Sequence, residues 1–134
     1  MNNFIKINNI NKKYEKNKTI KVLNDISFNF EAGKIYSIVG PSGSGKSTLL
    51  NLLSLIDTPS SGSIEINKNK ISFNNKIEND RIRAEKIGII YQDKNLLPDF
   101  SAIENVYLPN LLISNDKIQS KLFSFTSLIS IFDS

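Results

Sequence analysis

The first third of the chain alternates apolar and polar residues, the pattern that half-buried β-strands show. The alternation covers residues 4–7 and residues 26–30. Ala32 and Gly33 then favour a turn, and residues 35–39 form a short apolar run typical of a buried strand. The pattern therefore predicts two half-exposed strands, a turn and a buried strand, in that order along the chain.

The middle of the chain predicts a helix followed by several short elements. An apolar run at residues 49–53 predicts a helix that begins near Lys46. Residues 57–62 hold a cluster of Asp, Pro, Ser and Gly that ends this helix. The segments that follow are predicted to be a strand at residues 63–66, a polar surface loop at residues 68–79, one or two helical turns at residues 80–86 and a second buried strand at residues 87–91.

The residues beyond 100 predict two helices. Ser101 and Glu104 have the spacing of a capping box, so a helix is expected to start there. It should run to about Leu112, with Pro109 ending or kinking it. A last helix is expected from about Ser114, because apolar residues then recur at spacings of three and four. These residues form one stripe: Ile118, Leu122, Phe125, Ile129 and Phe132.

A glycine-rich segment lies between the third predicted strand and the first predicted helix. Residues 40–48 read G-P-S-G-S-G-K-S-T and complete the G-x-x-x-x-G-K-[ST] form of a phosphate-binding loop. A plain Gly/Ser-rich turn is the alternative, and the match at every fixed position, in the required strand–loop–helix context, argues against it. The predicted phosphate-binding residues are Gly40, Pro41, Ser42, Gly43, Ser44, Gly45, Lys46, Ser47 and Thr48.

Each part of this loop has a chemical reason to bind a nucleoside triphosphate. Backbone N–H groups around Gly43 and Gly45 can wrap a phosphate because little side-chain bulk intervenes. The helix that begins near Lys46 points the positive end of its dipole at the same anion. The Lys46 ammonium is a point charge for the β- and γ-phosphates, and the Ser47 hydroxyl is placed to bind Mg²⁺. The chain therefore binds such a nucleotide or descends from a protein that did.

Composition changes this picture little. Basic residues outnumber acidic ones by 17 to 13. An anionic ligand such as ATP would explain the excess of positive charge. However, the lysines are scattered and the chain is rich in Asn, Lys and Ile, so compositional drift is the better interpretation. The sequence contains no basic cluster, so nucleic acid is not predicted as a partner. The sequence has no cysteine, no signal-peptide pattern and no apolar stretch of membrane-spanning length.

Three further features accompany the phosphate loop. Tyr14 lies upstream of it in the sequence K-K-Y. Gln92 ends the second apolar run, and residues 96–100 read L-L-P-D-F shortly after it. Together with residues 40–48, these features resemble the nucleotide-binding subunit of an ABC (ATP-binding cassette) transporter. The resemblance implies that Tyr14 stacks on adenine, and that Gln92 reaches Mg²⁺ and the attacking water and couples to the membrane partner.

Each of these residues also has an ordinary alternative. Tyr14 could be a half-exposed strand aromatic, and Gln92 could be the polar end of a strand. Leu96 and Leu97 either line the groove that receives a coupling helix of the membrane subunit or fill the core. The sequence alone leaves these alternatives open.

The stretch at residues 91–109 narrows the resemblance to a bacterial subgroup that powers lipoprotein release and macrolide or peptide export. The cell-division ABC ATPase is nearly as close. The likeness spans residues 4–113 and implies an α/β fold. It would comprise an ABC-type P-loop NTPase core, an N-terminal antiparallel β subdomain and the start of a helical subdomain, incomplete at the C-terminal end. The resemblance implies one partial ATP-binding domain over residues 1–134. Residues 1–91 would form the β subdomain and the P-loop core, and residues 92–134 the loop that begins at Gln92 and the start of the helical subdomain.

The catalytic groups of the family have no counterpart in this sequence. They are an aspartate–glutamate pair, a serine–glycine–glycine–glutamine signature and a switch histidine, whereas the chain has 6 Gly and no His. Asp93 and Asp133 each end an apolar run, but neither position fits the metal-binding aspartate of the family. No catalytic residue is therefore identified, although the resemblance is to ATPases that use ATP and Mg²⁺.

The resemblance also implies a setting for the chain. The expected partners are a transmembrane permease subunit and either a second copy of the chain or a complementing C-terminal fragment. The expected location is cytoplasmic, peripheral on the inner face of the cell membrane. Two alternative functions remain: a fragment that holds ATP and Mg²⁺ without hydrolysis, and a cell-division-type ABC ATPase.

Overall fold

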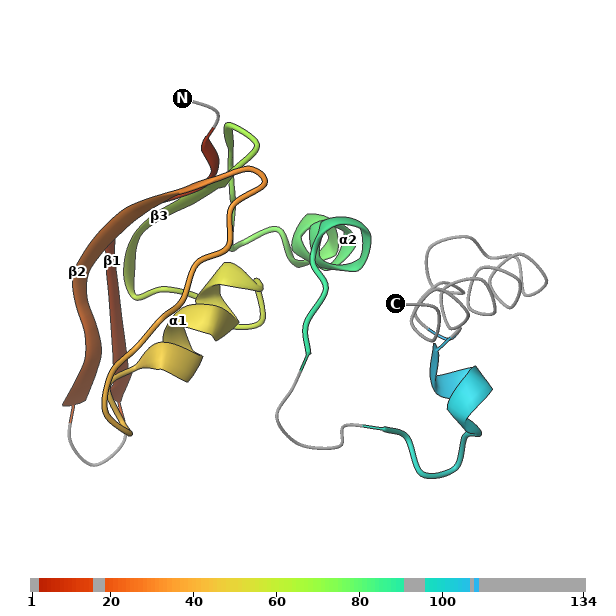
Figure 1. Ribbon diagram of the computed structural model, residues 1–134. Helices are drawn as coiled ribbons and strands as arrows, with labels where there is room; N and C mark the ends of the chain where they lie inside the picture. The colour runs from red at the N-terminus through yellow and green to blue at the C-terminus, as the bar shows by residue number, and fades with distance from the viewer. Residues whose placement is uncertain (1–2, 16–18, 91–95, 107, 109–134) are drawn as a thin grey trace. The chain divides into compact units, whose positions relative to one another are not determined.

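The computed structural model describes residues 3–15, 19–90, 96–106 and 108 (Figure 1). The chain divides into two units, Met1–Asp80 and Arg81–Ser134, which are described separately below. The elements in chain order are β1 (Asn3–Glu15), β2 (Thr19–Glu31), α1 (Lys46–Leu53), β3 (Ser61–Ile66), β4 (Asn69–Lys70) and α2 (Lys76–Lys86). Residues 102–106 and 108 are also helical.

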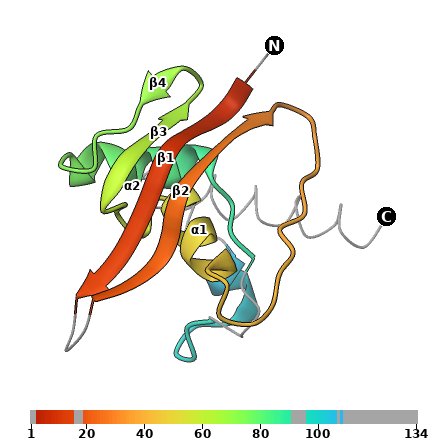
Figure 2. The same ribbon diagram turned by 90° about the vertical axis from the view of Figure 1, so that its left-hand side faces the viewer.

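The first unit is built on a four-stranded antiparallel sheet in the order β2-β1-β3-β4 (Figure 2). β1 lies between β2 and β3, so that Ile5 pairs with Phe30 on one side and with Ile66 on the other. β1 and β2 are each 13 residues long, which is much longer than the predicted segments at residues 4–7 and 26–30. The N-terminal antiparallel β subdomain predicted from the sequence is confirmed.

The two long strands continue through bulges that break the period-two pattern. The β1–β2 register shifts between Ile7 and Ile10 and again between Ile10 and Lys12. At this irregularity Asn9 and Asp25 adopt positive φ angles of 48° and 52°, a conformation that Asn and Asp tolerate better than most residues. Their side chains are joined by a 2.7 Å hydrogen bond from Asn9 Nδ2 to Asp25 Oδ1. Because bulges change which residues face the core, the sequence alternation underestimates both strands.

The core of the first unit lies between one face of the sheet and α1 (Figures 1 and 2). Most of its buried apolar side chains come from three strands and the helix, and Leu55 and Ile71 follow α1 and β4. Burying an Ile or Leu side chain contributes about 1.5–3 kcal/mol. The apolar stretch of α1 predicted a packed helix, and the bounds Lys46–Leu53 agree with the prediction. The buried apolar residues are Ile7, Ile10, Leu23, Leu52, Leu55, Ile64, Ile66 and Ile71.

The C-terminal end of α1 is closed by backbone hydrogen bonds rather than by glycine. Ile56 N donates to Asn51 O at 2.9 Å, and Leu55 N donates to Leu52 O at 3.1 Å. This pair of bonds is the Schellman pattern, and it places Leu55 at a φ of 58°. The left-handed conformation disfavours Leu, but the buried Leu55 side chain offsets that cost by packing in the core. The chain is thereby turned towards Asp57.

Two predicted buried strands are wrong in the described residues. Residues 34–41 form neither helix nor strand, and Ile35 and Val39 are exposed. Residues 87–90 likewise form no strand, and Ile90 is exposed. A strand requires a neighbour to satisfy its backbone N–H and C=O groups, and no described segment pairs with either run.

The polar loop predicted at residues 68–79 is also partly wrong. It contains β4, and α2 starts within it at Lys76, before the predicted residue 80. Asn75 accounts for this early start, because its Oδ1 accepts a hydrogen bond of 3.2 Å from Glu78 N. The polar composition of the segment hid a capped helix start.

The described part of the second unit confirms the predicted capping box. Glu104 Oε2 accepts from Ser101 N at 2.8 Å, and Glu104 N donates to Ser101 Oγ at 3.3 Å. The predicted last helix and Pro109 lie outside the described residues. Among the helices that the structure describes, none has the length and apolar character needed to cross a membrane.

Candidate functional site

The glycine-rich loop at residues 40–45 leads directly into the first turn of α1. Gly43 and Gly45 have φ angles of 79° and 90°, in the left-handed region that favours glycine. Gly45 is also packed tightly, because a Cβ there would lie 2.9 Å from Leu23 Cδ2 and 3.0 Å from Val22 O. Glycine is therefore required at this position for both conformation and space, and β2 fixes where the loop meets the helix.

Lys46 joins the two ends of the loop. Its Nζ donates hydrogen bonds of 2.8 Å to Gly40 O and 2.8 Å to Pro41 O. A 3.3 Å backbone bond from Ser44 N to Pro41 O adds to the turn. The ammonium group is consequently held over the loop by neutral carbonyl oxygens. An anionic oxygen would form a stronger, charge-assisted hydrogen bond with it than these carbonyls do.

The start of α1 is electrostatically suited to an anion. Gly45 provides no side-chain cap, and the first turn of the helix contains no acidic residue. The N-terminal amides and the helix dipole therefore present a positive potential that is not neutralised within the helix. Ser47 and Thr48 lie in this first turn, so their hydroxyls accompany the amides. The arrangement can hold a phosphate group.

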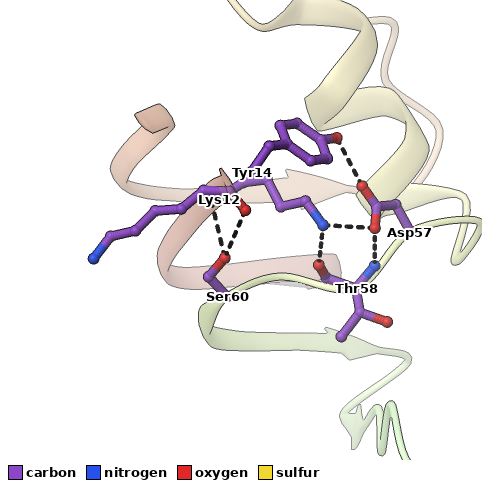
Figure 3. A network of polar contacts seen from close by, with 6 residues as sticks. Lys12, Tyr14, Asp57, Thr58 and Ser60 are labelled. Carbon is purple, nitrogen blue, oxygen red and sulfur yellow. Dashed lines mark hydrogen bonds and ion pairs between the residues drawn. The ribbon is translucent and has the colours of Figure 1, made fainter. Parts of the chain in front are cut away.

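Tyr14 lies in a side-chain network at the C-terminal end of β1 (Figure 3). Its hydroxyl donates a 2.8 Å hydrogen bond to Asp57 Oδ2. Lys12 Nζ lies 2.6 Å from Asp57 Oδ1 and donates to Thr58 O at 2.7 Å. The same ammonium is 4.7 Å from the centroid of the Tyr14 ring, a cation–π contact. Lys12 and Tyr14 are two residues apart on the strand and thus lie on the same side of it.

Protonation in this network follows from its hydrogen bonds. The hydrogen bond to Asp57 raises the pKa of the Tyr14 phenol above its ordinary value of 10.0, and burial acts in the same direction. A hydrogen bond from Thr48 partly opposes this rise in the Tyr14 pKa. Burial raises the pKa of Asp57, but the hydrogen bonds from Lys12, Tyr14 and the Thr58 amide outweigh it and hold the pKa below 3.8. Asp57 is therefore a carboxylate at neutral pH.

The structure brings most of the predicted site residues into one unit. The loop residues 40–48 and Tyr14 all belong to the first unit. Gln92 lies outside the described residues, so its predicted roles at the metal and the water stay predictions. Within the part of the chain that the structure describes, no cluster of three His, Cys, Asp or Glu residues could hold a metal ion.

Sequence reasoning missed Lys12, Asp57 and Thr58. In the sequence Asp57 belongs to a helix-breaking cluster, and nothing there pairs it with β1, which lies far away along the chain. The one available signal was the i, i+2 spacing of Lys12 and Tyr14, which puts both side chains on one face of a strand.

The glycine-rich loop, the start of α1 and the antiparallel sheet together define a P-loop nucleotide-binding domain. A profile of the family described as ABC transporter matches residues 23–131, which is more than half of the chain. The chain therefore belongs to the ABC transporter ATP-binding family, and the sequence-based prediction of this family is confirmed.

Particular relatives sharpen this assignment. The lipoprotein-releasing system ATP-binding protein LolD 1 of Chlorobium chlorochromatii is 39% identical, over 98% of this chain and 56% of its own. LolD of Rickettsia bellii is 41% identical, over 83% of this chain and 48% of its own. This chain thus spans about half the length of the curated relatives it matches.

A solved structure confirms the predicted fold. The ATP-binding cassette MJ0796, in a dimeric post-hydrolysis state bound to ADP and Pi, is similar with a TM-score of 0.83 and 33% sequence identity. The match covers 91% of this chain and 54% of that one. The fold is accordingly that of an ABC cassette, of which the described residues contain the antiparallel sheet and associated helices.

Proposed function

We propose that this chain forms the nucleotide-holding portion of an ABC transporter ATPase of the lipoprotein-release type, and that it binds ATP with Mg²⁺. The observation that carries the proposal is the phosphate loop, in which Lys46 Nζ bridges Gly40 O and Pro41 O at 2.8 Å each. The positively polarised start of α1 follows this bridge directly. The similarity to two LolD proteins supports the choice of subgroup.

The residues present fit a triphosphate. The amides of residues 43–45 and the first turn of α1 would contact phosphate oxygens, with no nearby acidic residue of that turn to repel them. Lys46 would exchange its two carbonyl partners for the β- and γ-phosphates. Ser47 would supply a hydroxyl ligand to Mg²⁺, an ion that takes most of its remaining ligands from phosphates and water. Gln92 is proposed as a further ligand.

Tyr14 is proposed to stack on the adenine base. Tyr14 is 39% exposed, so part of the ring remains available, and it lies in the same unit as the phosphate loop. Stacking of a base on an aromatic ring contributes about 1–3 kcal/mol. The loop and Tyr14 would then bind the two ends of the same nucleotide.

Hydrolysis and export are proposed for the complete transporter rather than for these residues alone. Cleavage of ATP needs a carboxylate or equivalent group to position the attacking water, and the sequence offers no aspartate–glutamate pair of the family kind. A permease subunit, and a second copy or a complementing C-terminal fragment, are proposed partners at the inner face of the cell membrane. By itself, the chain is proposed to hold ATP-Mg²⁺ with negligible turnover.

Removal of the Lys46 ammonium tests this proposal. Lys46→Ala should abolish the fluorescence change of a labelled ATP analogue titrated with Mg²⁺, because the β- and γ-phosphates lose their cation. Lys34→Ala is the matched control, since it removes one positive charge from an exposed lysine of the same unit. Equal titration curves for Lys46→Ala and the unmodified chain would contradict the proposal, and a steady, Lys46-dependent release of phosphate would contradict the lack of turnover.

A further inference from the structure

The Tyr14 ring is fixed at its hydroxyl by a carboxylate that is itself held by several donors. Asp57 Oδ2 accepts from the Tyr14 hydroxyl at 2.8 Å. Asp57 Oδ1 accepts from Lys12 Nζ at 2.6 Å and from Thr58 N at 2.7 Å (Figure 3). A carboxylate with these three donors has little freedom to rotate, so the phenol bound to it is restrained in turn.

Lys12 restrains the ring from a second direction. Its ammonium lies 4.7 Å from the ring centroid and is anchored by Asp57 Oδ1 and by Thr58 O, at 2.6 and 2.7 Å. Lys12 is only 8% exposed, whereas Tyr14 is 39% exposed. Lys12 therefore covers part of one face of the ring, and a planar ligand would stack on the face opposite it.

We propose that Asp57 and Lys12 are positioning residues that hold the Tyr14 ring ready to stack on the nucleotide base. This inference rests on the proposed function, in which Tyr14 contacts adenine. The network connects β1 to the segment that follows α1. The ring orientation is thus tied to the segment that follows α1, the helix that begins at the phosphate loop.

The benefit of such positioning is a smaller loss of side-chain freedom on binding. A free tyrosine must give up rotamer entropy when it stacks, a cost of roughly twofold to tenfold in affinity for one immobilised side chain. If Asp57 and Lys12 already hold the ring, this entropy is lost during folding and not on binding. Loss of the hydroxyl should therefore weaken ATP binding even though the stacking surface remains.

The test compares two ligands that differ in whether they carry a base. ATP-Mg²⁺ and tripolyphosphate-Mg²⁺ would be titrated calorimetrically into the unmodified chain and into Tyr14→Phe, Asp57→Asn and the double variant. Tyr36→Phe is the matched control, because Tyr36 is 40% exposed and its hydroxyl also makes one hydrogen bond, accepting from Glu31 N at 2.9 Å. Tyr14→Ala and Lys46→Ala test the proposed function in the same assay.

The expected result is a base-specific loss. Tyr14→Phe and Asp57→Asn should each weaken ATP binding about twofold to tenfold and leave tripolyphosphate binding unchanged. The double variant should be no weaker than Asp57→Asn alone, because Asp57 holds both the Tyr14 hydroxyl and the Lys12 ammonium. Tyr36→Phe should match the unmodified chain with both ligands.

Other outcomes would overturn the inference. Unchanged ATP binding in Tyr14→Phe, together with a loss in Tyr14→Ala, would show that the ring stacks without being positioned. Equal weakening of both ligands by Asp57→Asn would show a general structural role. If Tyr14→Ala has no effect, the adenine contact itself fails, and if Lys46→Ala has none, the phosphate site fails. Tyr14→Phe is conservative, so the inference stays testable even if Asp57→Asn does not fold.

Discussion

The two parts of the candidate site are constructed in opposite ways. The phosphate loop is made from consecutive residues, and its geometry depends on backbone groups, left-handed glycines and the hydrogen bonds of one lysine. The Tyr14 network is made from side chains of β1 and of the segment after α1, which are more than 40 residues apart in sequence. The first part depends on local conformation and the second on tertiary packing.

Because of this difference, the two parts of the site should be sensitive to different kinds of substitution. A backbone site fails when a Cβ is added where none fits, even if every polar side chain is kept. A side-chain network fails when one partner is removed, and the other partners are then left with unsatisfied groups. Both parts rest on the same core between the sheet and α1, so changes must be chosen that affect one part at a time.

The largest effect is expected at the loop. Gly45→Ala should lower the free energy of unfolding by about 2–5 kcal/mol, because Ala is strained at a φ of 90° and its Cβ would meet Leu23 and Val22. Gly33→Ala separates the two causes, since Gly33 has a φ of 72° but open space around it. Urea unfolding should give Gly33→Ala the smaller loss, about 1–2 kcal/mol. Equal losses would show that the contact with β2 is irrelevant.

The next effect is expected at the network. Asp57→Ala should lower the free energy of unfolding by about 1.5–3 kcal/mol, because Lys12 is largely buried and loses its charged partner. Glu85→Ala is the control: it removes an exposed partner of Arg81 in α2 and should leave the urea midpoint unchanged. A loss in Glu85→Ala as large as that in Asp57→Ala would mean that the network has no special role in stability.

The dependence of stability on pH should distinguish the network further. The lowered pKa of Asp57 gives a contribution that is complete above pH 3.8 and is lost as pH falls through the lower folded value. The raised pKa of Tyr14 gives a contribution that is complete below pH 10.0 and is lost as pH rises through the higher folded value. The difference in unfolding free energy between the unmodified chain and Asp57→Asn should therefore shrink below pH 3.8. A constant difference across that range would refute the pKa assignment.

The smallest effect is expected in the second unit, where one side chain organises a turn. Asn105 Oδ1 accepts from Leu97 N at 2.8 Å, while its Nδ2 donates to Leu97 O at 3.1 Å and Phe100 O at 3.0 Å. Asn105→Ala should cost about 0.5–1.5 kcal/mol locally and speed hydrogen exchange at the Leu97 amide. Unchanged exchange at that amide would show that the turn holds without Asn105.

The same contrast explains what could be predicted from the sequence. The loop at residues 40–48 is recognisable because its chemistry depends on neighbouring residues. The family and fold follow from it together with Tyr14, Gln92 and residues 96–100. The Ser101–Glu104 capping box was recognisable for the same reason. Local patterns of this kind need no knowledge of distant contacts.

Apart from the capped start of α2 at Asn75, the errors involve distant partners. The lengths of β1 and β2 were underestimated because the bulge at Asn9 and Asp25 interrupts the alternation. Residues 35–39 have the composition of a buried strand, but no described segment lies beside them to pair with. Asp57 has an ordinary place in a helix-breaking cluster, and only the folded chain brings it to Lys12 and Tyr14.

The phosphate loop and the Tyr14 network are proposed to contact opposite ends of one nucleotide. The chain contains no tryptophan, so Tyr14→Trp would place a single indole at the proposed base-stacking position. ATP-Mg²⁺ should quench this fluorescence, whereas tripolyphosphate-Mg²⁺ should not, and Lys46→Ala in the same background should remove the response to ATP. Fluorescence that stays constant while ATP-Mg²⁺ binds, as measured by calorimetry, would contradict the claim.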